Sequence, residues 1–518
     1  MIDIQVVYDL LGCGEDTVVE FKTSRGGFPY SFWSSFSAFA NTNGGVIVLG
    51  VNEKNKKAFV DGLTKGQVTA LKKQFWDNAN NRNKVSTPLL KNEEAHIEEI
   101  PGEGWVLVCE VPRARYDQKP VYLDGQPYGN TYKRRHEGDY HCTDDEVRQM
   151  FADANLKQSS HDAHILKGYS MDDIDLGTLH KYRKAYDLRH ENHPWSALSD
   201  MEFLKKVEAW RKDRESGEEG FTVAGIMMFG KTQSVTDQSC MPWFFPDYRE
   251  HMGEMSGERW SDRIYPDGTW EVNVYQYFTR VFQKLSLLLP KPFHLADDGV
   301  TRMEFTPAHT AVREALANAL IHAQHNSMGN VVVDSWHNKI VISNPGNMLV
   351  SVSEFYEGQH SVCRNPLLQK MFVFVGVGEK AGSGADVIVK GWEDRKWMKP
   401  EIRQCEEPDR VEMVMEMVNE ENRSMPEGKE LARSWQGVGK ELGVDFYVLE
   451  SLADYCREAR SLAEIAQYLG FADRYKMKKK YIDPLLGRYL EMTISDSPNH
   501  PNQRYVLTEE GRKVLEAD

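Results

Sequence analysis

Alternating and continuous apolar segments over residues 18–150 predict a module that mixes strands and helices. Residues 18–22 alternate apolar and polar side chains, the two-residue period of a strand. Residues 32–40 are typical of a helix. The continuous β-branched run at 46–51 predicts a strand buried on both faces, and a similar run at 105–111 stops at Pro112. The order of these segments predicts an α/β module.

Polar segments divide the rest of the chain. We expect a linker near residues 158–162, an exposed loop or helix end at 211–220 and a third break at 419–430. The chain has 518 residues, which suggests three or four domains at roughly 100–200 residues per domain. We expect the boundaries to fall at residues 1–155, 156–300, 301–420, 421–445 and 446–518.

The charge balance restricts the partners of the chain. It carries 63 Lys and Arg against 78 Asp and Glu, a formal net charge of -15. An acidic chain binds polyanions only through local basic patches. The seven cysteines form no CxxC pair, which disfavours a zinc ribbon and suits a reducing compartment. We find neither a signal peptide nor an apolar run of about 18 residues, so we expect a cytoplasmic protein without a membrane span.

The first candidate for chemistry is the strand Glu20-Phe21-Lys22. Glu20 and Lys22 share one face of it, Phe21 points to the core, and Glu15 can approach from the preceding turn. Two carboxylates can hold a divalent ion that activates water, while a lysine neutralises a phosphate. Most pairs at this spacing are ordinary surface ion pairs. The spacing by itself leaves a nuclease site and a surface pair open.

Two further motifs give this strand a context. Residues 37–45 run Ser-Ala-Phe-Ala-Asn-Thr-Asn-Gly-Gly, and residues 48–53 run Val-Leu-Gly-Val-Asn-Glu. Together with the strand they resemble the AlbA-like module of the Schlafen superfamily. The resemblance implies catalytic roles for Glu15, Glu20 and Lys22, with Glu15 and Glu20 as metal ligands. It also implies nucleic-acid contacts from the basic stretch that holds Lys133, Arg134 and Arg135.

Part of this motif also has a purely structural interpretation. Asn43-Gly44-Gly45 supplies a turn with positive φ that leads into the buried strand, and Asn41 and Thr42 can cap the helix end or the turn. Asn52 stands where nucleases of the family usually have a third acid. An amide is a weaker metal ligand than a carboxylate, so the module can bind nucleic acid without cutting it.

A second candidate site lies on the helix predicted at residues 310–321, which Thr306-Pro307 can start. Glu314, Asn318 and His322 recur every four residues and form one stripe. A carboxylate and an amide on one face can position water and hold a magnesium ion. A polar stripe that faces solvent is the simpler alternative.

Downstream motifs at 342–346, 363–366 and 378–384 follow this helix in order. With the run at 313–322 they resemble GHKL-type ATPases, in the variant that is fused to AlbA-like modules; residues 224–230 and 260–263 resemble its leading region. The resemblance implies ATP with Mg²⁺ or Mn²⁺, Glu314 as general base and Asn318 as metal ligand. The implied ATP contacts also include His322, Asn344, Gly346, Arg364, Asn365, Gly382, Ser383 and Gly384.

This second resemblance has two departures. Residues 323–325 read Ala-Gln-His where the family usually has an acid, so hydrolysis stays open even if ATP binds. Asn344 stands at the position of the adenine-reading Asp, and an amide pairs with adenine less selectively.

The C-terminal pattern resembles a winged helix-turn-helix. Residues 461–464 form a capping box before a helix, and residues 492–495 and 504–507 are typical of two wing strands. The intervening helix carries basic residues suited to phosphate contacts: Arg474, Lys476, Lys478, Lys479 and Lys480. A winged helix that docks on protein is the alternative.

These patterns predict an α+β multidomain protein with an AlbA/Schlafen-like α/β module, a GHKL-like α/β sandwich and a C-terminal winged helix. Three functions remain open. The first is an ATP-responsive, nucleic-acid-binding regulator or defence protein. The second is a metal-dependent endonuclease that acts on RNA, such as a tRNA-like substrate, or on DNA. The third is an interaction scaffold with dead sites. The nucleic-acid target and the oligomeric state, a homo-oligomer included, stay open.

Overall fold

A computed structural model gives the fold. It describes residues 18–54, 57–136, 138–156, 158, 160–251, 260–290, 306–358, 362–378, 383–406, 408–418, 446–469, 477–494 and 503–515. The chain divides into two compact units, one that runs up to Glu416 and one that holds the residues from Phe446 on. Within the first unit we distinguish an N-terminal module (residues 18–156), a helical segment (160–246) and a sheet domain (247–418).

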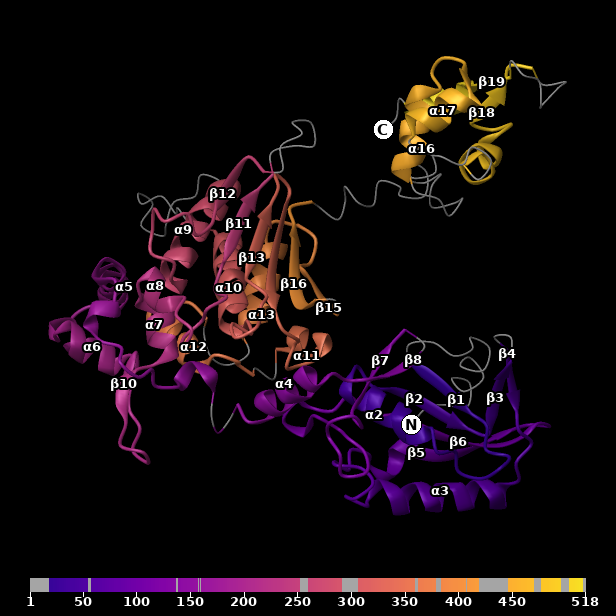
Figure 1. Ribbon diagram of the computed structural model, residues 1–518, viewed down its shortest axis with the longest axis horizontal. Helices are drawn as coiled ribbons and strands as arrows, with labels where there is room; N and C mark the ends of the chain where they lie inside the picture. Colours follow the sequence, from indigo (N-terminus) through magenta and orange to yellow (C-terminus); the bar gives the residue numbers. More distant parts are fainter. Residues whose placement is uncertain are drawn as a thin grey trace. The chain divides into compact units, whose positions relative to one another are not determined.

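The N-terminal module is built on a four-stranded sheet of order β1-β2-β6-β5 (Figure 1). Its strands are β1 (Val19–Lys22), β2 (Gly45–Leu49), β5 (Ala95–Ile100) and β6 (Gly104–Val111). β1 and β2 are parallel because helix α2 (Phe32–Asn41) connects them, whereas β6 runs antiparallel to both of its neighbours. Helix α3 (Lys65–Ala79) and helix α4 (Asp144–Ala154) complete the helical part.

Two apolar layers bury this sheet. Phe32, Trp33 and Phe36 of α2 pack with Phe75 of α3 on one face. On the other face, Phe21 of β1 lies in a second cluster, against which Val60 packs. Val60 belongs to the hairpin formed by β3 (Val51–Lys54) and β4 (Lys57–Val60). A second hairpin, β7 (Tyr132–Arg135) with β8 (Gly138–His141), lies against α2.

The helical segment connects the module to the sheet domain. It contains α5 (Leu176–Arg189), α6 (Asp200–Lys206), α7 (Val223–Phe229) and α8 (Thr232–Val235). The stretch predicted as a linker is firmly anchored where it is described, because the buried Asp162 accepts hydrogen bonds from the backbone N–H groups of Leu367 and Leu368. The charged segment at 211–220 is a largely exposed hairpin of β9 (Trp210–Lys212) and β10 (Glu219–Phe221).

The sheet domain has six strands in the order β12-β11-β13-β14-β16-β15 (Figure 1). The strands are β11 (Asp247–Glu250), β12 (Asp262–Ile264), β13 (Val332–Ser335), β14 (Lys339–Pro345), β15 (Glu401–Glu406) and β16 (Asp409–Glu416). Only the pair β11 and β13 is parallel among these neighbours. The domain also holds α9 (Val274–Leu288), α10 (Pro307–His322), α11 (Val352–Glu357), α12 (Pro366–Phe374) and α13 (Ser383–Glu393).

Helices α10 and α13 pack closely against each other and against the sheet. A Cβ atom at Gly391 of α13 would lie 2.6 Å from the carbonyl oxygen of Pro307, so only glycine fits there. The buried Trp392 donates a hydrogen bond of 2.8 Å to the carbonyl oxygen of Glu416 in β16. This packing fixes the inner face of α10 relative to the strands.

The second unit holds α16 (Phe446–Tyr455), α17 (Leu462–Tyr468), a π-helical turn η7 (Lys478–Ile482) and α19 (Glu509–Leu515). A three-stranded sheet of order β17-β19-β18 accompanies them, with β17 (Arg460–Ser461), β18 (Leu490–Met492) and β19 (Arg504–Leu507). Its apolar core includes Leu452, Ile465, Ile482 and Tyr505.

Most of the local predictions are confirmed. The strands at 18–22 and 105–111, the helices at 32–40 and 310–321 and the capping box of Ser461 with Glu464 are all present. The run at 46–51 is buried on both sides but is divided at Gly50, which has a φ of 94°. The fold is mixed α+β with several domains. Among the described residues, no helix is long and apolar enough to cross a membrane.

Candidate functional site

Glu20 of β1 lies between two cations. The Nζ atom of Lys22 contacts Oε1 of Glu20, and the Nη2 atom of Arg134 lies 2.7 Å from Oε2. The side chains of Glu20 and Arg134 are 9% and 3% exposed. Arg134 also lies 2.9 Å from the carboxylate of Asp139 and stacks over the ring of Phe39. Both oxygens of Glu20 therefore face protein cations.

The motif at residues 41–45 places Arg134 beside Glu20. Thr42 donates through Oγ1 to the carbonyl of Ala38 at the end of α2 and accepts a hydrogen bond of 2.9 Å from the backbone N–H of Arg134. Asn41 joins the same helix to the backbone of Val121 and Tyr132 through hydrogen bonds of 2.9 Å. Thr42 thus caps the end of α2 as predicted, whereas the side chain of Asn41 binds the backbone of distant segments instead of capping the helix.

Gly44 completes this connection. Its φ is 79°, and a Cβ atom would lie 2.8 Å from the carbonyl oxygen of Val111, so no other residue fits without a shift of the backbone. The turn joins the end of α2 to the start of β2 at a point where β6 runs close by. The positive φ predicted for this turn is confirmed.

Opposing effects act on the charge of Arg134. Burial lowers the pKa of its guanidinium, but Glu20 and Asp139 outweigh burial and hold the pKa above its usual value. Arg134 therefore stays protonated and neutralises Glu20 at all ordinary pH values. A divalent ion at Glu20 would have to bind carboxylate oxygens, and the guanidinium of Arg134 already occupies one of them. Within the described ranges, no group of three His, Cys, Asp or Glu residues is arranged to hold a metal ion.

The remaining residues expected around this first site are dispersed. Glu15 lies outside the described residues. Asn52 lies on β3 with an exposed side chain, opposite Phe59 of β4. Lys133 forms an ion pair with Glu146 of α4, and Arg135 is half-buried at the end of β7. Of the three basic residues expected to contact nucleic acid, Arg135 and Lys133 are thus the more accessible.

A second site forms around α10. A Cβ atom on Gly384 would lie 3.1 Å from Oε1 of Glu314 and 3.3 Å from Nδ2 of Asn318. Residue 384 lies in the first turn of α13, so the packing of α13 on α10 brings this glycine to the polar stripe. The backbone N–H of Gly378 donates a hydrogen bond of 2.9 Å to Oε2 of Glu314. Glu314 of the predicted stripe is buried and lies beside Gly378 and Gly384.

Glu314, Asn318 and Gly384 line a pocket of about 130 Å³, which we call the α10 pocket. Asn344 of β14 closes it from the sheet side, and its apolar walls include Ile342, Ile402 and Met413. Sites for drug-sized ligands usually measure about 300–1,000 Å³, so a whole nucleotide would extend out of this pocket. Gly382 and the side chain of Ser383 lie outside the described residues.

His322 lies at the end of α10 and lines the same pocket. Burial, aided by the nearby charge of Arg364, lowers the pKa of His322 to about 4. The imidazole is therefore neutral at neutral pH and can serve as a hydrogen-bonding group, but it brings no positive charge to a phosphate.

Arg364 and Asn365 hold the end of α10 in place. Asn365 donates through Nδ2 to the carbonyl oxygens of Ile321 and Ala323, at 2.8 and 2.7 Å. Arg364 donates 3.0 Å hydrogen bonds to the carbonyl oxygens of His322 and Asn347. These contacts satisfy the orphan carbonyls that every helix end leaves. Both residues were expected to contact ATP; in the structure they hold the end of α10, and Arg364 also lines the α10 pocket.

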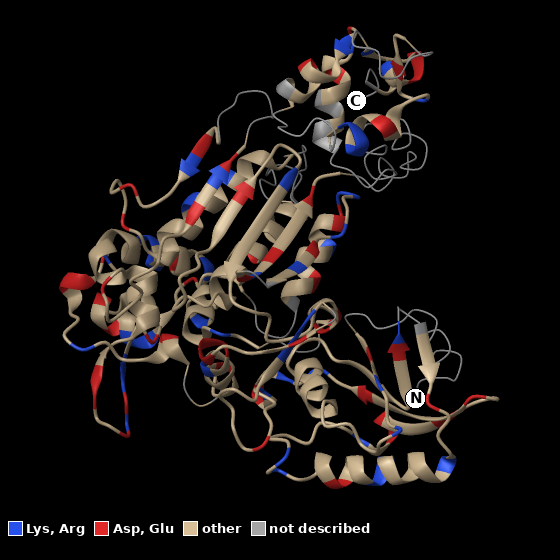
Figure 2. Cartoon of the chain, turned by 45° about the vertical axis from the view of Figure 1, so that its right-hand side comes forward, with Lys and Arg blue, Asp and Glu red and all other residues tan. Residues whose placement is uncertain are grey.

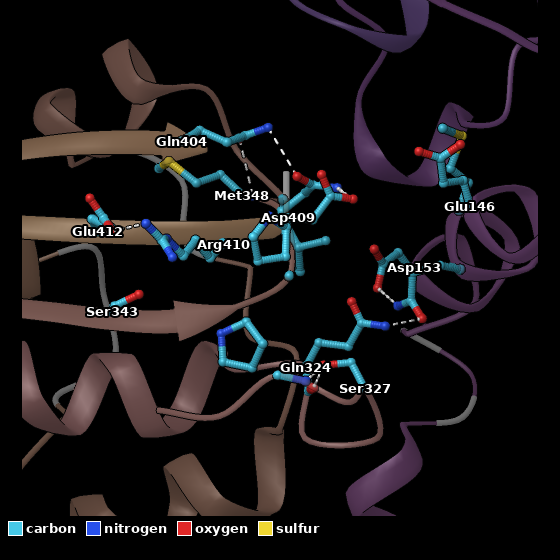
Figure 3. Close-up of a pocket in the computed structure, with 18 of the residues that line it drawn as sticks. Glu146, Asp153, Gln324, Ser327, Ser343, Met348, Gln404, Asp409, Arg410 and Glu412 are labelled. Carbon is cyan, nitrogen blue, oxygen red and sulfur yellow. Dashed lines mark hydrogen bonds and ion pairs between the residues drawn. The ribbon is translucent and has the colours of Figure 1, made fainter. Parts of the chain in front are cut away.

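A larger groove of about 660 Å³ lies between the N-terminal module and the sheet domain. Figure 3 shows Glu146 and Asp153 on the module side, opposite Ser343, Gln404 and Arg410 on strands of the sheet domain. We call it the interdomain groove. Gly346, with a φ of 97°, lines this groove rather than the α10 pocket. Sequence analysis missed the groove because its two walls come from distant segments.

Charge is mixed in the groove and over the described surface. Arg249 pairs with Asp334, and Arg410 pairs with Glu412. Figure 2 shows basic and acidic residues interspersed along the strands and helices. A bound polyanion would have to compete with these internal ion pairs.

In the second unit, the basic cluster is only partly described. Arg474 and Lys476 lie outside the described residues. Lys478 pairs with Asp483 at 2.6 Å, whereas the side chains of Lys479 and Lys480 are exposed. These two lysines are the accessible part of the cluster.

Comparison with protein families identifies four segments. Residues 15–143 match the family described as "Schlafen, AlbA_2", and residues 329–415 match "Putative ATP-dependent DNA helicase recG C-terminal". Residues 148–247 match "Domain of unknown function (DUF8451)", and residues 449–508 match "Filamentation induced by cAMP protein Fic-like, C-terminal domain". No curated protein matches the chain.

Among solved structures, the chain is similar to the DIP2311 protein from Corynebacterium diphtheriae. The sequence identity is 16%, the alignment covers 99% of this chain and 98% of that one, and the TM-score is 0.39. The Schlafen match contains Glu20 and Arg134, and the RecG match contains Asn344 and Gly384 but begins after Glu314 and Asn318 of α10. The chain therefore contains a Schlafen AlbA_2 domain at residues 15–143 and an ATP-binding-like domain of the RecG C-terminal kind at residues 329–415.

Proposed function

We propose that this protein is an ATP-binding regulator that contacts nucleic acid through its AlbA_2 domain without cleaving it. The observation that supports the nucleotide half of this proposal is that Glu314, Asn318 and Gly384 line one pocket. A carboxylate, an amide and a close glycine backbone are the groups that a GHKL-like site uses to activate water, hold Mg²⁺ and approach phosphates.

The residues around the α10 pocket fit a nucleotide with its metal ion. Asn318 would hold the ion together with phosphate oxygens, Glu314 would orient and deprotonate water, and Asn344 would face the base. Magnesium would supply charge neutralisation at the phosphates when it is bound. Because residues 323–325 lack the acid of related sites, we propose slow hydrolysis and a role for ATP as a switch.

The pairing of Glu20 with Lys22 and Arg134 supports the non-cleaving half of the proposal. The guanidinium of Arg134 stays charged and already neutralises the carboxylate of Glu20, which a catalytic metal ion would otherwise do. The nuclease alternative retains support from Glu20 and Lys22, which lie on one strand as that chemistry requires.

We further propose that the second unit is a winged helix that contacts nucleic acid through Lys479 and Lys480. The order of α16, α17, η7 and a small sheet supports this proposal. Transcription regulation and antiviral defence are both compatible with such an architecture, and the identity of the bound nucleic acid would separate them.

One assay tests the main proposal. The full chain is incubated with labelled RNA and DNA, with Mg²⁺ or Mn²⁺ and with or without ATP, and binding and cleavage are both measured. The regulator predicts binding without cleavage that survives Glu20→Gln. Cleavage that disappears in Glu20→Gln would establish the nuclease instead. Calorimetry with ATP tests the nucleotide half, and absence of binding to the wild-type chain would remove it and favour a scaffold.

A further inference from the structure

Arg113 of the AlbA_2 domain reaches into the ATP-binding-like domain. It follows Pro112 just after the end of β6, and its guanidinium donates hydrogen bonds to the carbonyl oxygens of Met348 and Val350, at 2.8 and 3.2 Å. Residues 347–350 form part of the wall of the α10 pocket. A side chain from the first domain thus holds a wall of the nucleotide site of the second.

Asp153 of α4 makes a second connection. It accepts two hydrogen bonds from Arg364, one of 3.2 Å from Nε and one of 3.1 Å from Nη2. Arg364 lines the α10 pocket, and the same guanidinium binds the carbonyl oxygens of His322 and Asn347. The carboxylate therefore orients a group that ties the end of α10 to the pocket wall. The side chain of Arg364 is 8% exposed, so solvent screens this pair weakly.

The neighbouring amides extend this contact. Gln324 donates a hydrogen bond of 2.7 Å to Gln149 of α4, and Gln149 donates one of 2.9 Å to Asp153. Figure 3 shows Gln324 and Asp153 facing each other at the interdomain groove. Asn347, Met348 and Leu349 line both the groove and the α10 pocket. One short loop is thus shared by the two cavities.

We infer that Arg113 and Asp153 are positioning residues of the nucleotide site, so that the N-terminal module (residues 18–156) sets the affinity for ATP through the loop at residues 347–350. This inference rests on the proposed function and names its regulatory route. The loop at residues 347–350 lines the α10 pocket, so ATP bound there would contact the loop and can displace it. Movement of the loop alters its contacts with Arg113 and, through Arg364, with Asp153. By thermodynamic linkage, a ligand that binds the AlbA_2 domain and shifts Arg113 changes the affinity for ATP. Binding of ATP then changes the affinity for that ligand by the same factor.

The test measures binding of a non-hydrolysable ATP analogue to the full chain by calorimetry. Arg113→Gln and Asp153→Asn should each change the dissociation constant at least fivefold. Arg113→Lys keeps the charge but cannot donate in two fixed directions. Its dissociation constant for the analogue should therefore lie between those of wild type and Arg113→Gln. Arg115→Gln is the matched control, because Arg115 is exposed and pairs only with Asp117 in its own turn among the described contacts. Circular dichroism confirms that each variant is folded.

The outcomes separate the inference from the function on which it rests. Wild-type protein that binds the analogue, with Arg113→Gln and Asp153→Asn of unchanged affinity, overturns the inference alone. Wild-type protein that binds no analogue overturns the proposed function and the inference together. A second readout needs no nucleotide: amide hydrogen exchange at residues 347–350 should be faster in Arg113→Gln than in Arg115→Gln. Equal exchange in these two variants also overturns the inference.

Discussion

The guanidinium of Arg134 lies 2.7 Å from the carboxylate of Glu20, and both side chains are buried. The backbone of Arg134 is fixed by Thr42, and its second carboxylate partner, Asp139, is held by Ser35. An acid that could hold a metal ion is thus built into an internal ion-pair network. This arrangement favours a binding role for the AlbA_2 domain over catalysis.

Arg134→Gln should destabilise the N-terminal module by about 3 kcal/mol, since removal of one partner leaves a buried carboxylate unpaired. Chemical denaturation of the full chain measures the loss. Arg148→Gln is the control, because Arg148 is exposed and its ion pairs on α4 contribute about 0–1 kcal/mol. Equal stability of the two variants would contradict the structural role of Arg134.

Gly384→Val should weaken ATP binding about tenfold or more. The added side chain would start 3.1 Å from Glu314 and 3.3 Å from Asn318, in the space that a phosphate would need. Calorimetry with the non-hydrolysable analogue gives the affinity. The companion variant Glu314→Gln should still bind ATP but lose any hydrolysis, because the amide cannot accept the proton of water. Retained binding in Gly384→Val would place the nucleotide elsewhere.

The protein should lose stability as the pH falls from about 6.5 to about 4. Burial lowers the pKa of His325 to about 4, so its ring stays neutral in the folded state while the unfolded chain takes up a proton below about 6.5. Because the unfolded state binds more protons between these pH values, acid favours unfolding. For His325 alone, the free energy of unfolding should fall by about 3 kcal/mol over this range. Urea denaturation at several pH values measures the slope, which should be smaller in His325→Gln.

Lys119→Met should stabilise the protein below pH 7. Burial, reinforced by the charge of Arg113, lowers the pKa of Lys119 to about 7. Below that value both folded and unfolded states are protonated and the full cost of burying the charge applies. Between about pH 7 and 10 only the unfolded state keeps the proton, so the wild type gains stability as the pH rises. We expect a gain of about 2 kcal/mol at pH 6, after the loss of the hydrogen bond to Asn41, and a smaller gain at pH 9.

Lys479→Gln combined with Lys480→Gln should weaken nucleic-acid binding and reduce its dependence on salt. Each exposed lysine that contacts a phosphate contributes about 0.9 to the slope of log K against log salt, so the double variant should lower the slope by roughly 2. Fluorescence anisotropy over a salt series measures it. Lys478→Gln is the control, because this lysine pairs with Asp483. An unchanged slope would favour the protein-docking alternative for this unit.

The local parts of the fold followed from the sequence. The two-residue period of β1, the long polar stripe of α10 and the capping box of Ser461 with Glu464 all depend on neighbours within a few residues. The positive φ of Gly44 could be predicted for the same reason. The residue types of the two sites were likewise visible as Glu20 with Lys22 and as Glu314 with Asn318.

The partners of those residues could not be predicted. The sequence did not reveal that Arg134 lies against Glu20, or that Arg364 and Asn365 hold the end of α10. The nucleic-acid contact expected of Arg134 and the ATP contacts expected of Arg364 and Asn365 stay predictions. Nothing in the sequence indicated a role for Arg113 or Asp153, because each is an ordinary charged residue in its own segment. Their contacts lie 235 and 211 positions away in the chain.

The sequence by itself therefore determined the elements, the two families of domain and the residue types available for chemistry. The tertiary structure decided which charges neutralise one another, which glycine faces the stripe on α10 and which loop the two domains share. The physical reason is that backbone conformation responds to near neighbours, whereas a buried charge takes its partner from whatever the packing of distant segments brings within about 3 Å.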